Sequence, residues 1–401
     1  MTIITFHGLY SKSRNINLNK GVIPMLFIHN DVVADVLTME DAISCLEQAF
    51  GQLVEGTATH RPRCDLYAPS KENQQGYYRW GTMEGYNNGI FAIRMKSDII
   101  TWPTDDEGNQ TEEKYCREEG TYCGLVFLFS ADTGEPLALI NDGVIQHVRV
   151  GAGAGLGAKL LSRENSETVG MLGSGGMART FLSAFCCVRN IRKVKVYSPT
   201  KANREVYADE MRIKHNLEVI AVDDPQLVYE GVDIVSSCTD TMVPTIKGDW
   251  LEAGQHVTIV NAFEIAPDGL DVCDVKIRQG VQGLKLLEDA FEGVKGGDGI
   301  TVKAAQGHSP VAFIAGTPEE RKRLPRRNSS RDIVNVFPSY GDVISGRAQG
   351  REMEGEITFY QNSGMQGLQF SAVGGHVLEQ CLSKGLGRKI PAEWFLQDIR
   401  D

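Results

Sequence analysis

The chain has 401 residues, of which 42% are hydrophobic and 23% are charged, so it is long and apolar enough to bury a sizeable core and to form two domains. Its net charge of −11 argues against nucleic acid as a main partner. The sequence has no run of transmembrane length, no cleavable signal and no C-x-x-C pair among its nine cysteines. We therefore expect a cytoplasmic protein with no membrane partner and no metal site.

The first elements predict the start of an α+β domain. Residues 1–21 have the character of an N-terminal extension, and a short strand follows at 25–30. Apolar residues then recur at helical spacing between Thr38, which is a good capping residue, and Gly56. This pattern predicts a helix between those two residues.

Cationic side chains mark the strands that come next. Arg63 lies in a short extended piece. Arg94 and Lys96 lie in a strand predicted at 89–100, and they share one face of it because alternate residues of a strand point the same way. The turn at 132–135 predicts a hairpin whose returning strand completes this part of the substrate domain.

A helix rich in Gly and Ala is predicted from residue 143 to 162. Arg149 stands in its first turns. A guanidinium among such small residues is unusual unless an anion lies against it. We therefore expect Arg149 to bind an anionic group, with a structural ion pair as the alternative.

Residues 168–200 predict the first half of a dinucleotide-binding βαβ unit: a strand, a glycine turn, a helix and a second strand. In the pattern G-x-G-x-x-A, Gly173 permits the tight turn, Gly175 lets the backbone approach a pyrophosphate, and Ala178 lets helix and strand pack closely. The alternative is a plain structural turn. The predicted cofactor contacts here are Gly173, Ser174, Gly175, Gly176, Met177 and Ala178.

The end of the second strand favours NADP(H). A site for NAD usually has Asp or Glu at this place, but the chain has Ser198 and Thr200, with Lys201 and Arg204 just beyond. Two hydroxyls and two cations suit a 2′-phosphate. The alternative is a solvated helix start with incidental charges, so NAD(H) stays possible.

The later part of the chain continues the alternation of strands and helices. Thr239 and Asn261 follow predicted strands and are candidates for the nicotinamide side. Residues 287–345 show no clear period. A strand, a turn at Ser363 and a helix come after them, and we expect Ser363 to contact the cofactor.

Taken together, these features resemble the ornithine cyclodeaminase/mu-crystallin family. The markers are Pro62-Arg63, Arg94-Met95-Lys96-Ser97, the hairpin "DTGEPLALINDG", Arg149, "GMLGSGGMA", Val232-Asp233-Ile234-Val235 and the turn "NSGM". The resemblance implies an α/β fold in which a Rossmann-type dinucleotide-binding domain is inserted in a discontinuous α+β substrate and dimerisation domain. We expect the substrate domain to comprise 22–150 and 346–401, and the Rossmann-type domain to comprise 151–345 with an irregular insertion near 287–345.

The resemblance also implies roles for the cations. Arg149 is similar to the residue that binds the substrate carboxylate, and Arg63 to its second clamp. The family lysine beside the substrate carbonyl or imine corresponds to Arg94 or Lys96, and both are kept as catalytic candidates. We also expect Met83 on the substrate side.

One departure concerns the family's acid/base Asp. Phe263 stands at the aligned position here, with Glu264 next to it. Either Glu264 has taken this catalytic role, or the base is absent.

The resulting prediction is an NADP(H)-dependent oxidoreductase acting on a C=N or CH–NH bond next to a carboxylate. The small amino or imino acid would be its substrate and a homodimer its assembly. Two alternatives are a cyclodeaminase-type ammonia lyase that recycles NAD(H) and a non-catalytic NADPH-binding protein of the mu-crystallin type.

Overall fold

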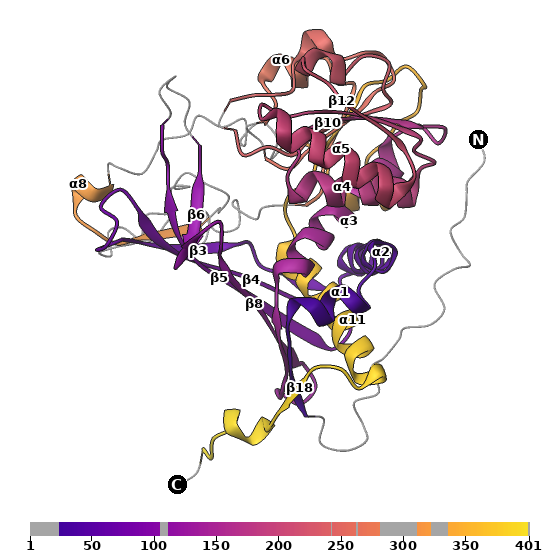
Figure 1. Cartoon of the computed structure of the whole chain (residues 1–401). Coiled ribbons are helices and arrows are strands. Elements are labelled where there is room, and N and C mark those ends of the chain that lie inside the picture. Colours follow the sequence, from indigo (N-terminus) through magenta and orange to yellow (C-terminus); the bar gives the residue numbers. More distant parts are fainter. Residues whose placement is uncertain are drawn as a thin grey trace.

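The computed structural model describes residues 24–104, 111–241, 243–261, 264–280, 311–321 and 336–399. Two large sheets organise these residues, with helices between and around them (Figure 1). The extension predicted at 1–21, Phe263 and most of the insertion at 287–345 lie outside the described residues. No helix in the described part of the chain is long and apolar enough to cross a membrane.

A seven-stranded, all-parallel sheet forms the nucleotide-binding half, which confirms the predicted Rossmann-type fold. Its strand order is β12-β11-β10-β13-β14-β17-β15. The strands are β10 (Thr168–Leu172), β11 (Lys193–Tyr197), β12 (Glu218–Ala221), β13 (Ile234–Ser237), β14 (His256–Ile259), β15 (Val275–Arg278) and β17 (Thr358–Gln361). Its longer helices are α4 (Gly176–Val188) and α5 (Lys201–His215), and its shorter ones are α6 (Pro267–Asp271), η1 (Pro225–Val228) and η2 (Gly248–Trp250).

Strand β17 differs from the expected division of the chain, which assigned all of 346–401 to the substrate domain. It lies between β14 and β15 in the parallel sheet. The reason is its burial on both faces: all four of its residues are buried, and Phe359 and Tyr360 are 0% exposed. A strand that is apolar on both sides belongs in the middle of a sheet with helices on both faces.

The second sheet is mixed and has eleven strands, in the order β16-β3-β4-β5-β8-β9-β1-β18, with β2, β6 and β7 at its side. Strand β16 (Val311–Ile314) comes from the segment expected in the nucleotide domain, yet it pairs in parallel with β3 of this sheet. The other strands are β1 (Met25–Ile28), β2 (Thr59–His60), β3 (Cys64–Pro69), β4 (Tyr77–Asn87), β5 (Ile90–Thr101), β6 (Glu113–Cys116), β7 (Glu118–Glu119), β8 (Cys123–Ser130), β9 (Pro136–Asn141) and β18 (Arg388–Ile390).

Helix α3 (Gly143–Leu161) connects the two halves and explains why its sequence is rich in small residues. A Cβ at Gly151 would lie 2.7 Å from the carbonyl oxygen of Thr180 in α4, so the two helices touch along their backbones. The other helices are α1 (Asn30–Val36), α2 (Met39–Glu55), α8 (Pro318–Arg321), α10 (Tyr340–Ile344), α11 (Gln366–Lys384) and η4 (Ala392–Phe395). Helices α2, α3 and α11 pack together beside the mixed sheet (Figure 1).

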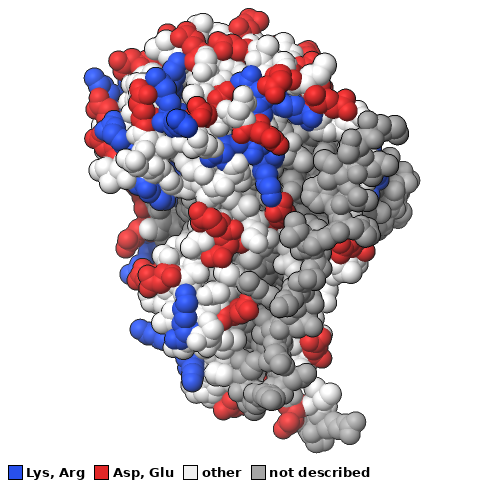
Figure 2. Space-filling model, turned by 90° about the vertical axis from the view of Figure 1, so that its right-hand side faces the viewer, with Lys and Arg blue, Asp and Glu red and all other residues white. Residues whose placement is uncertain are grey.

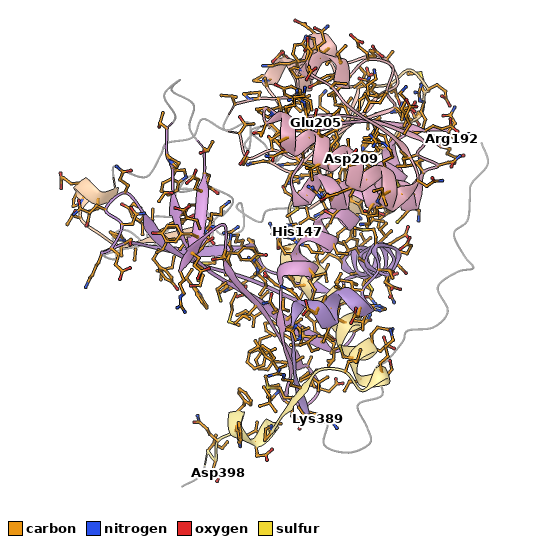
Figure 3. All side chains as sticks on the ribbon, in the orientation of Figure 1. His147, Arg192, Glu205, Asp209, Lys389 and Asp398 are labelled. Atoms are coloured by element: carbon orange, nitrogen blue, oxygen red, sulfur yellow. The ribbon has the colours of Figure 1, made fainter. Side chains whose placement is uncertain are left out.

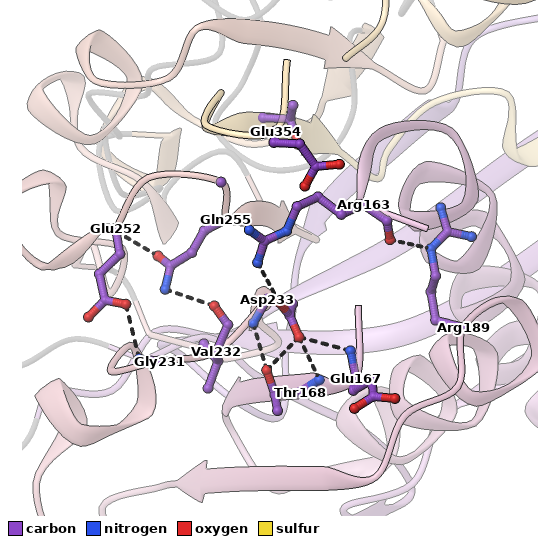
Figure 4. A network of polar contacts seen from close by, with 12 residues as sticks. Arg163, Glu167, Thr168, Arg189, Gly231, Val232, Asp233, Glu252, Gln255 and Glu354 are labelled. Atoms are coloured by element: carbon purple, nitrogen blue, oxygen red, sulfur yellow. Dashed lines mark hydrogen bonds and ion pairs between the residues drawn. The ribbon is translucent and has the colours of Figure 1, made fainter. Parts of the chain in front are cut away.

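Asp233 fastens the amino ends of β10 and β13 together (Figure 4). Its Oδ2 accepts hydrogen bonds from the backbone N–H groups of Glu167 (2.8 Å) and Thr168 (2.9 Å) and from the Thr168 hydroxyl, and Arg163 pairs with the same carboxylate. Burial raises the pKa of Asp233, but these bonds outweigh it, and the pKa is lowered. The motif around Asp233 therefore stabilises the edge of the sheet opposite the one where cofactors bind.

The described charges on the face shown in Figure 2 are mixed, with Lys and Arg side chains interspersed among Asp and Glu. The three arginines expected on the substrate side, Arg63, Arg94 and Arg149, are instead buried. Interior cations need a specific partner, whereas surface ones are solvated.

Candidate active site

Buried polar side chains gather on one face of β5. Arg94, Lys96 and Asp98 alternate along the strand and so share this face. Met83 lies directly opposite Arg94 in the β4–β5 pairing and is 3% exposed. The structure thus brings three of the predicted substrate-side residues together.

Arg149 reaches this region from α3 and has no carboxylate partner among the described residues. Its Nη1 donates to Gln369 Oε1 (2.7 Å) and its Nη2 to Gln146 Oε1 (2.8 Å), and both are neutral amides. Burial and, second, the charge of Arg94 lower the pKa of Arg149 to about 9. A buried guanidinium that is hydrogen-bonded to neutral amides attracts an anion, because an anion would compensate its charge.

Arg94 has a counter-ion and sits next to Arg149. Its Nε donates to Asp142 Oδ2 at 2.5 Å, and the side chain of Asp142 is 0% exposed. The guanidinium carbons of Arg94 and Arg149 lie 5.5 and 5.0 Å from the ring centroid of Phe370 in α11. Both cations therefore lie near the same aromatic ring, and the charge of Arg94 acts on Arg149.

Lys96 lies two residues along the same face, in a different environment. Its Nζ is 2.8 Å from Asp98 Oδ2 and 5.1 Å from the ring centroid of Tyr122. Asp98 is shared, because Arg79 donates to both of its oxygens at 2.9 and 2.5 Å. Burial, followed by the charge of Arg79, holds the pKa of Lys96 well below its usual value.

Arg63 is the fourth predicted cation, and it is anchored on β3 and the segment before it. Its Nε donates to Asp65 Oδ1 at 2.8 Å, and both side chains are buried. The charge of Arg63 acts on both Arg149 and Lys96. These three cations and Arg94 therefore form one group, the cationic cluster.

The glycine turn has the geometry that a pyrophosphate needs. Gly173 has a φ of +103°, and a Cβ there would lie 2.4 Å from the carbonyl oxygen of Cys238, so this turn requires glycine. Gly175 caps α4 with extended backbone, and nothing lies within 4 Å of where its Cβ would be. The open space faces the free N–H groups at the start of a 13-residue helix, so these residues fit a dinucleotide.

Most of the predicted cofactor residues lie in the turns that follow parallel strands, at one edge of the sheet. Gly173 follows β10 and Ser198 follows β11, while Thr239, Asn261 and Ser363 follow β13, β14 and β17. Met177 and Ala178 continue into α4, with Ala178 fully buried and Met177 packed against the same core. This topology places Ser363, which the expected division assigned to the substrate domain, at the same edge of the parallel sheet as Thr239 and Asn261.

The residues expected to hold a 2′-phosphate differ in how deeply they are buried and in whether other residues already bind them. Arg204 is buried, donates to the carbonyl oxygen of Ser198 at 2.8 Å and pairs with Asp223. Thr200 caps α5 without a side-chain hydrogen bond, and the side chain of Lys201 is 69% exposed. Arg204 therefore shapes the turn, and Lys201 and Thr200 are the groups that face outward.

Glu264 lies in the nucleotide half and is occupied by hydrogen bonds. Its Oε1 accepts from the hydroxyls of Ser237 and Thr239 and from the Thr239 N–H, and its Oε2 accepts from the N–H groups of Val260 and Asn261, all at 2.7–3.0 Å. The residue is 0% exposed. Its carboxylate joins the loops after β13 and β14, and none of these bonds connects it to the cationic cluster.

Several residues of the site are absent from the sequence prediction. They supply the environment of the cations: Asp98, Tyr122, Asp142, Gln146, Gln369 and Phe370. His147 is another, because its Nε2 would lie 2.9 Å from a Cβ at Gly176, while its Nδ1 is 2.8 Å from the carbonyl oxygen of Gly143 (Figure 3). Only Asp98 and Asp142 had a local signal: Asp98 lies two residues after Lys96 on the same strand, and Asp142 caps the helix that carries Arg149.

Comparison with known proteins gives consistent matches. The family model described as the ornithine cyclodeaminase/mu-crystallin family matches residues 24–384. The alanine dehydrogenase of Archaeoglobus fulgidus is 27% identical over 370 residues, covering 91% of this chain and 98% of its own. A Delta(1)-pyrroline-2-carboxylate reductase of Bacillus cereus is 26% identical over 270 residues, covering 67% and 74%. The solved structure of the Thermococcus litoralis Delta(1)-pyrroline-2-carboxylate reductase, in complex with NADH and L-proline, superposes with a TM-score of 0.68 at 22% identity and covers 91% of this chain and 100% of its own.

Proposed function

Because the chain belongs to the ornithine cyclodeaminase/mu-crystallin family, we propose that it is an NADP(H)-dependent oxidoreductase acting on a C=N or CH–NH bond next to a carboxylate. The relatives named above are oxidoreductases of such bonds, which supports this class. The observation that carries the proposal is Arg149, a buried guanidinium whose hydrogen bonds within the described part of the chain go to the amides of Gln146 and Gln369. A substrate carboxylate supplies the anion that this side chain lacks.

The chain's own residues would bind and orient the substrate. Arg149 and Arg94 would hold its carboxylate, with Asp142 and Phe370 fixing the orientation of Arg94. A bound nicotinamide supplies or accepts the hydride. In the reducing direction the carbon of a protonated imine gains that hydride and its nitrogen keeps the proton, so an amine and the oxidised cofactor result. The guanidinium of Arg94 would polarise the C=N bond beside the carboxylate.

The direct test is NADPH oxidation with Delta(1)-pyrroline-2-carboxylate and with 2-oxo acids mixed with methylamine, which form cyclic and N-alkyl imino acids. We expect NADPH consumption matched by formation of the amino acid. If the folded protein binds NADPH but reduces none of these compounds in either direction, the proposal fails and a binding function is favoured instead.

NADP(H) is proposed as the cofactor because β11 ends without a carboxylate and Lys201 and Thr200 face outward beyond it. We predict that Ser198→Asp reverses the preference, since a carboxylate at this place accepts from a ribose hydroxyl and repels a 2′-phosphate. The ratio of the two dissociation constants should change by about a hundredfold, which corresponds to about 2.7 kcal/mol. Fluorescence titration with NADPH and NADH measures it.

Ser198→Ala is the matched control, because it removes the hydroxyl that accepts from Ser174 without adding charge. It should shift the ratio by less than about threefold. A wild-type protein that binds NADH more tightly than NADPH would contradict the proposed preference.

A homodimer through the mixed sheet is also proposed. The outer face of its central strands carries half-buried apolar side chains such as Phe91, Phe127 and Phe129. Trp394 and Leu396, near the end of the chain, are 75% and 54% exposed. Apolar patches of this kind mark interfaces. Light scattering that gave the mass of a single chain at micromolar concentration would contradict the dimer.

A further inference from the structure

The cationic cluster carries more charge than the carboxylate of a simple amino acid neutralises. At one end of it, Asp142 is the counter-ion of Arg94. Arg149 lies over the same ring as Arg94, and its hydrogen bonds with other described residues go to neutral amides. This end therefore has two cations and one carboxylate among the described residues, and one α-carboxylate would neutralise it.

The other end has a similar imbalance, because the nearby carboxylate of Glu112, which also acts on Arg79, is paired with Lys114. Arg79 and Lys96 both contact Asp98, and the described residues provide Lys96 with no other carboxylate. Arg79 is 1% exposed, and the side chain of Lys96 is 14% exposed. Burying a second cation beside an already neutralised pair is unfavourable unless an anion joins them. The lowered pKa of Lys96 reflects this cost, which arises chiefly from burial and then from Arg79.

The two ends belong to one site. Tyr122 contacts both ends. Its ring lies under Lys96, and the charges of Asp142, Arg94 and Arg149 act on the pKa of its hydroxyl. Residues 94 and 96 of a strand are about 7 Å apart and point the same way. A ligand with an anionic group at each end of a short chain spans such a distance.

We infer that the substrate has a second anionic group, a carboxylate in the simplest case, and that Lys96 binds it while Arg149 and Arg94 bind the α-carboxylate. This inference rests on the proposed function and narrows its substrate to dicarboxylic imino or amino acids. Lys96 would then be a specificity-determining residue, and Arg79 and Asp98 would position it.

The test uses two probes that differ only at the far end of the chain: 2-oxoglutarate, with a terminal carboxylate, and 2-oxopentanoate, with a terminal methyl group. Calorimetric titration of the protein saturated with NADP⁺ should give about tenfold tighter binding of 2-oxoglutarate. Lys96→Met should bring the two affinities to within about twofold by weakening 2-oxoglutarate alone, and Lys96→Arg should keep most of the difference. Lys159→Met, which removes a surface lysine paired with Glu47, should change neither affinity.

Equal binding of the two probes by the wild-type protein overturns the inference, whether or not the variants fold. If imino acids are reduced with NADPH in that case, the proposed function stands and only the substrate class is wrong. If no imino acid is reduced either, the proposed function fails together with it. A Lys96→Met variant that keeps both its thermal midpoint and its preference for 2-oxoglutarate would show that another group binds the second anion.

Discussion

Replacing Arg149 with Met is expected to lower kcat/KM for the imino acid about a thousandfold, equivalent to about 4 kcal/mol of lost binding to the reacting complex. The change removes the guanidinium proposed to bind the α-carboxylate, which lies over the ring of Phe370, and puts an uncharged, flexible side chain in its place. Truncating one partner of a buried, hydrogen-bonded charge pair costs about 2–5 kcal/mol, which sets this magnitude. Steady-state kinetics with saturating NADPH measures the effect.

The controls for this prediction separate binding from folding. Arg149→Lys keeps the charge but loses the planar fork, so it should recover only a small part of the activity. NADPH binding should change by less than about twofold in both variants, since Arg149 is on α3 and the nucleotide residues follow the strands of the parallel sheet. Full activity in Arg149→Met would show that the carboxylate binds elsewhere, and an equal loss of NADPH binding would indicate damage to the fold.

The sequence predicted the fold and the cations because both depend on local patterns. The glycine turn at Gly173, the alternation of Arg94 and Lys96 and the small-residue helix around Arg149 are each marked by a period or a special residue within a short stretch of sequence. The placement of β17 could not be predicted in the same way. Its pattern identifies a strand, but its neighbours β14 and β15 lie roughly a hundred residues earlier, and pairing at such distance has no local signal.

The residues around the cations could not be predicted either, because they are also distant in the sequence. Gln369 and Phe370 come from α11, more than two hundred residues after Arg149, and their apolar helix predicts core packing alone. Tyr122 precedes a strand without a motif of its own. What distinguishes Arg94 from Lys96 is therefore visible only in three dimensions: Arg94 pairs with Asp142, whereas Lys96 shares Asp98 with Arg79.

Glu264→Gln decides between the proposed reductase and the cyclodeaminase alternative, and we expect it to destabilise the protein without removing the catalytic group. Each carboxylate oxygen accepts from two or three donors, so an amide must direct its own N–H groups at some of them. Leaving buried donors of this kind unsatisfied should lower the free energy of unfolding by about 3 kcal/mol. Burial raises the pKa of Glu264, yet its hydrogen bonds with the N–H groups of Thr239 and Asn261 oppose this and hold the carboxylate in place.

The measurement combines urea unfolding with kinetics at low temperature, where the variant remains folded. Per folded molecule, kcat should stay within about threefold of the wild-type value, because the carboxylate has no lone pair directed at a substrate. Glu252→Gln is the matched control: Glu252 also accepts from a backbone N–H, that of Gly231, but at an exposed site, so its cost should be below about 1 kcal/mol. A stable Glu264→Gln protein with no activity would instead identify Glu264 as the acid/base that ammonia elimination requires.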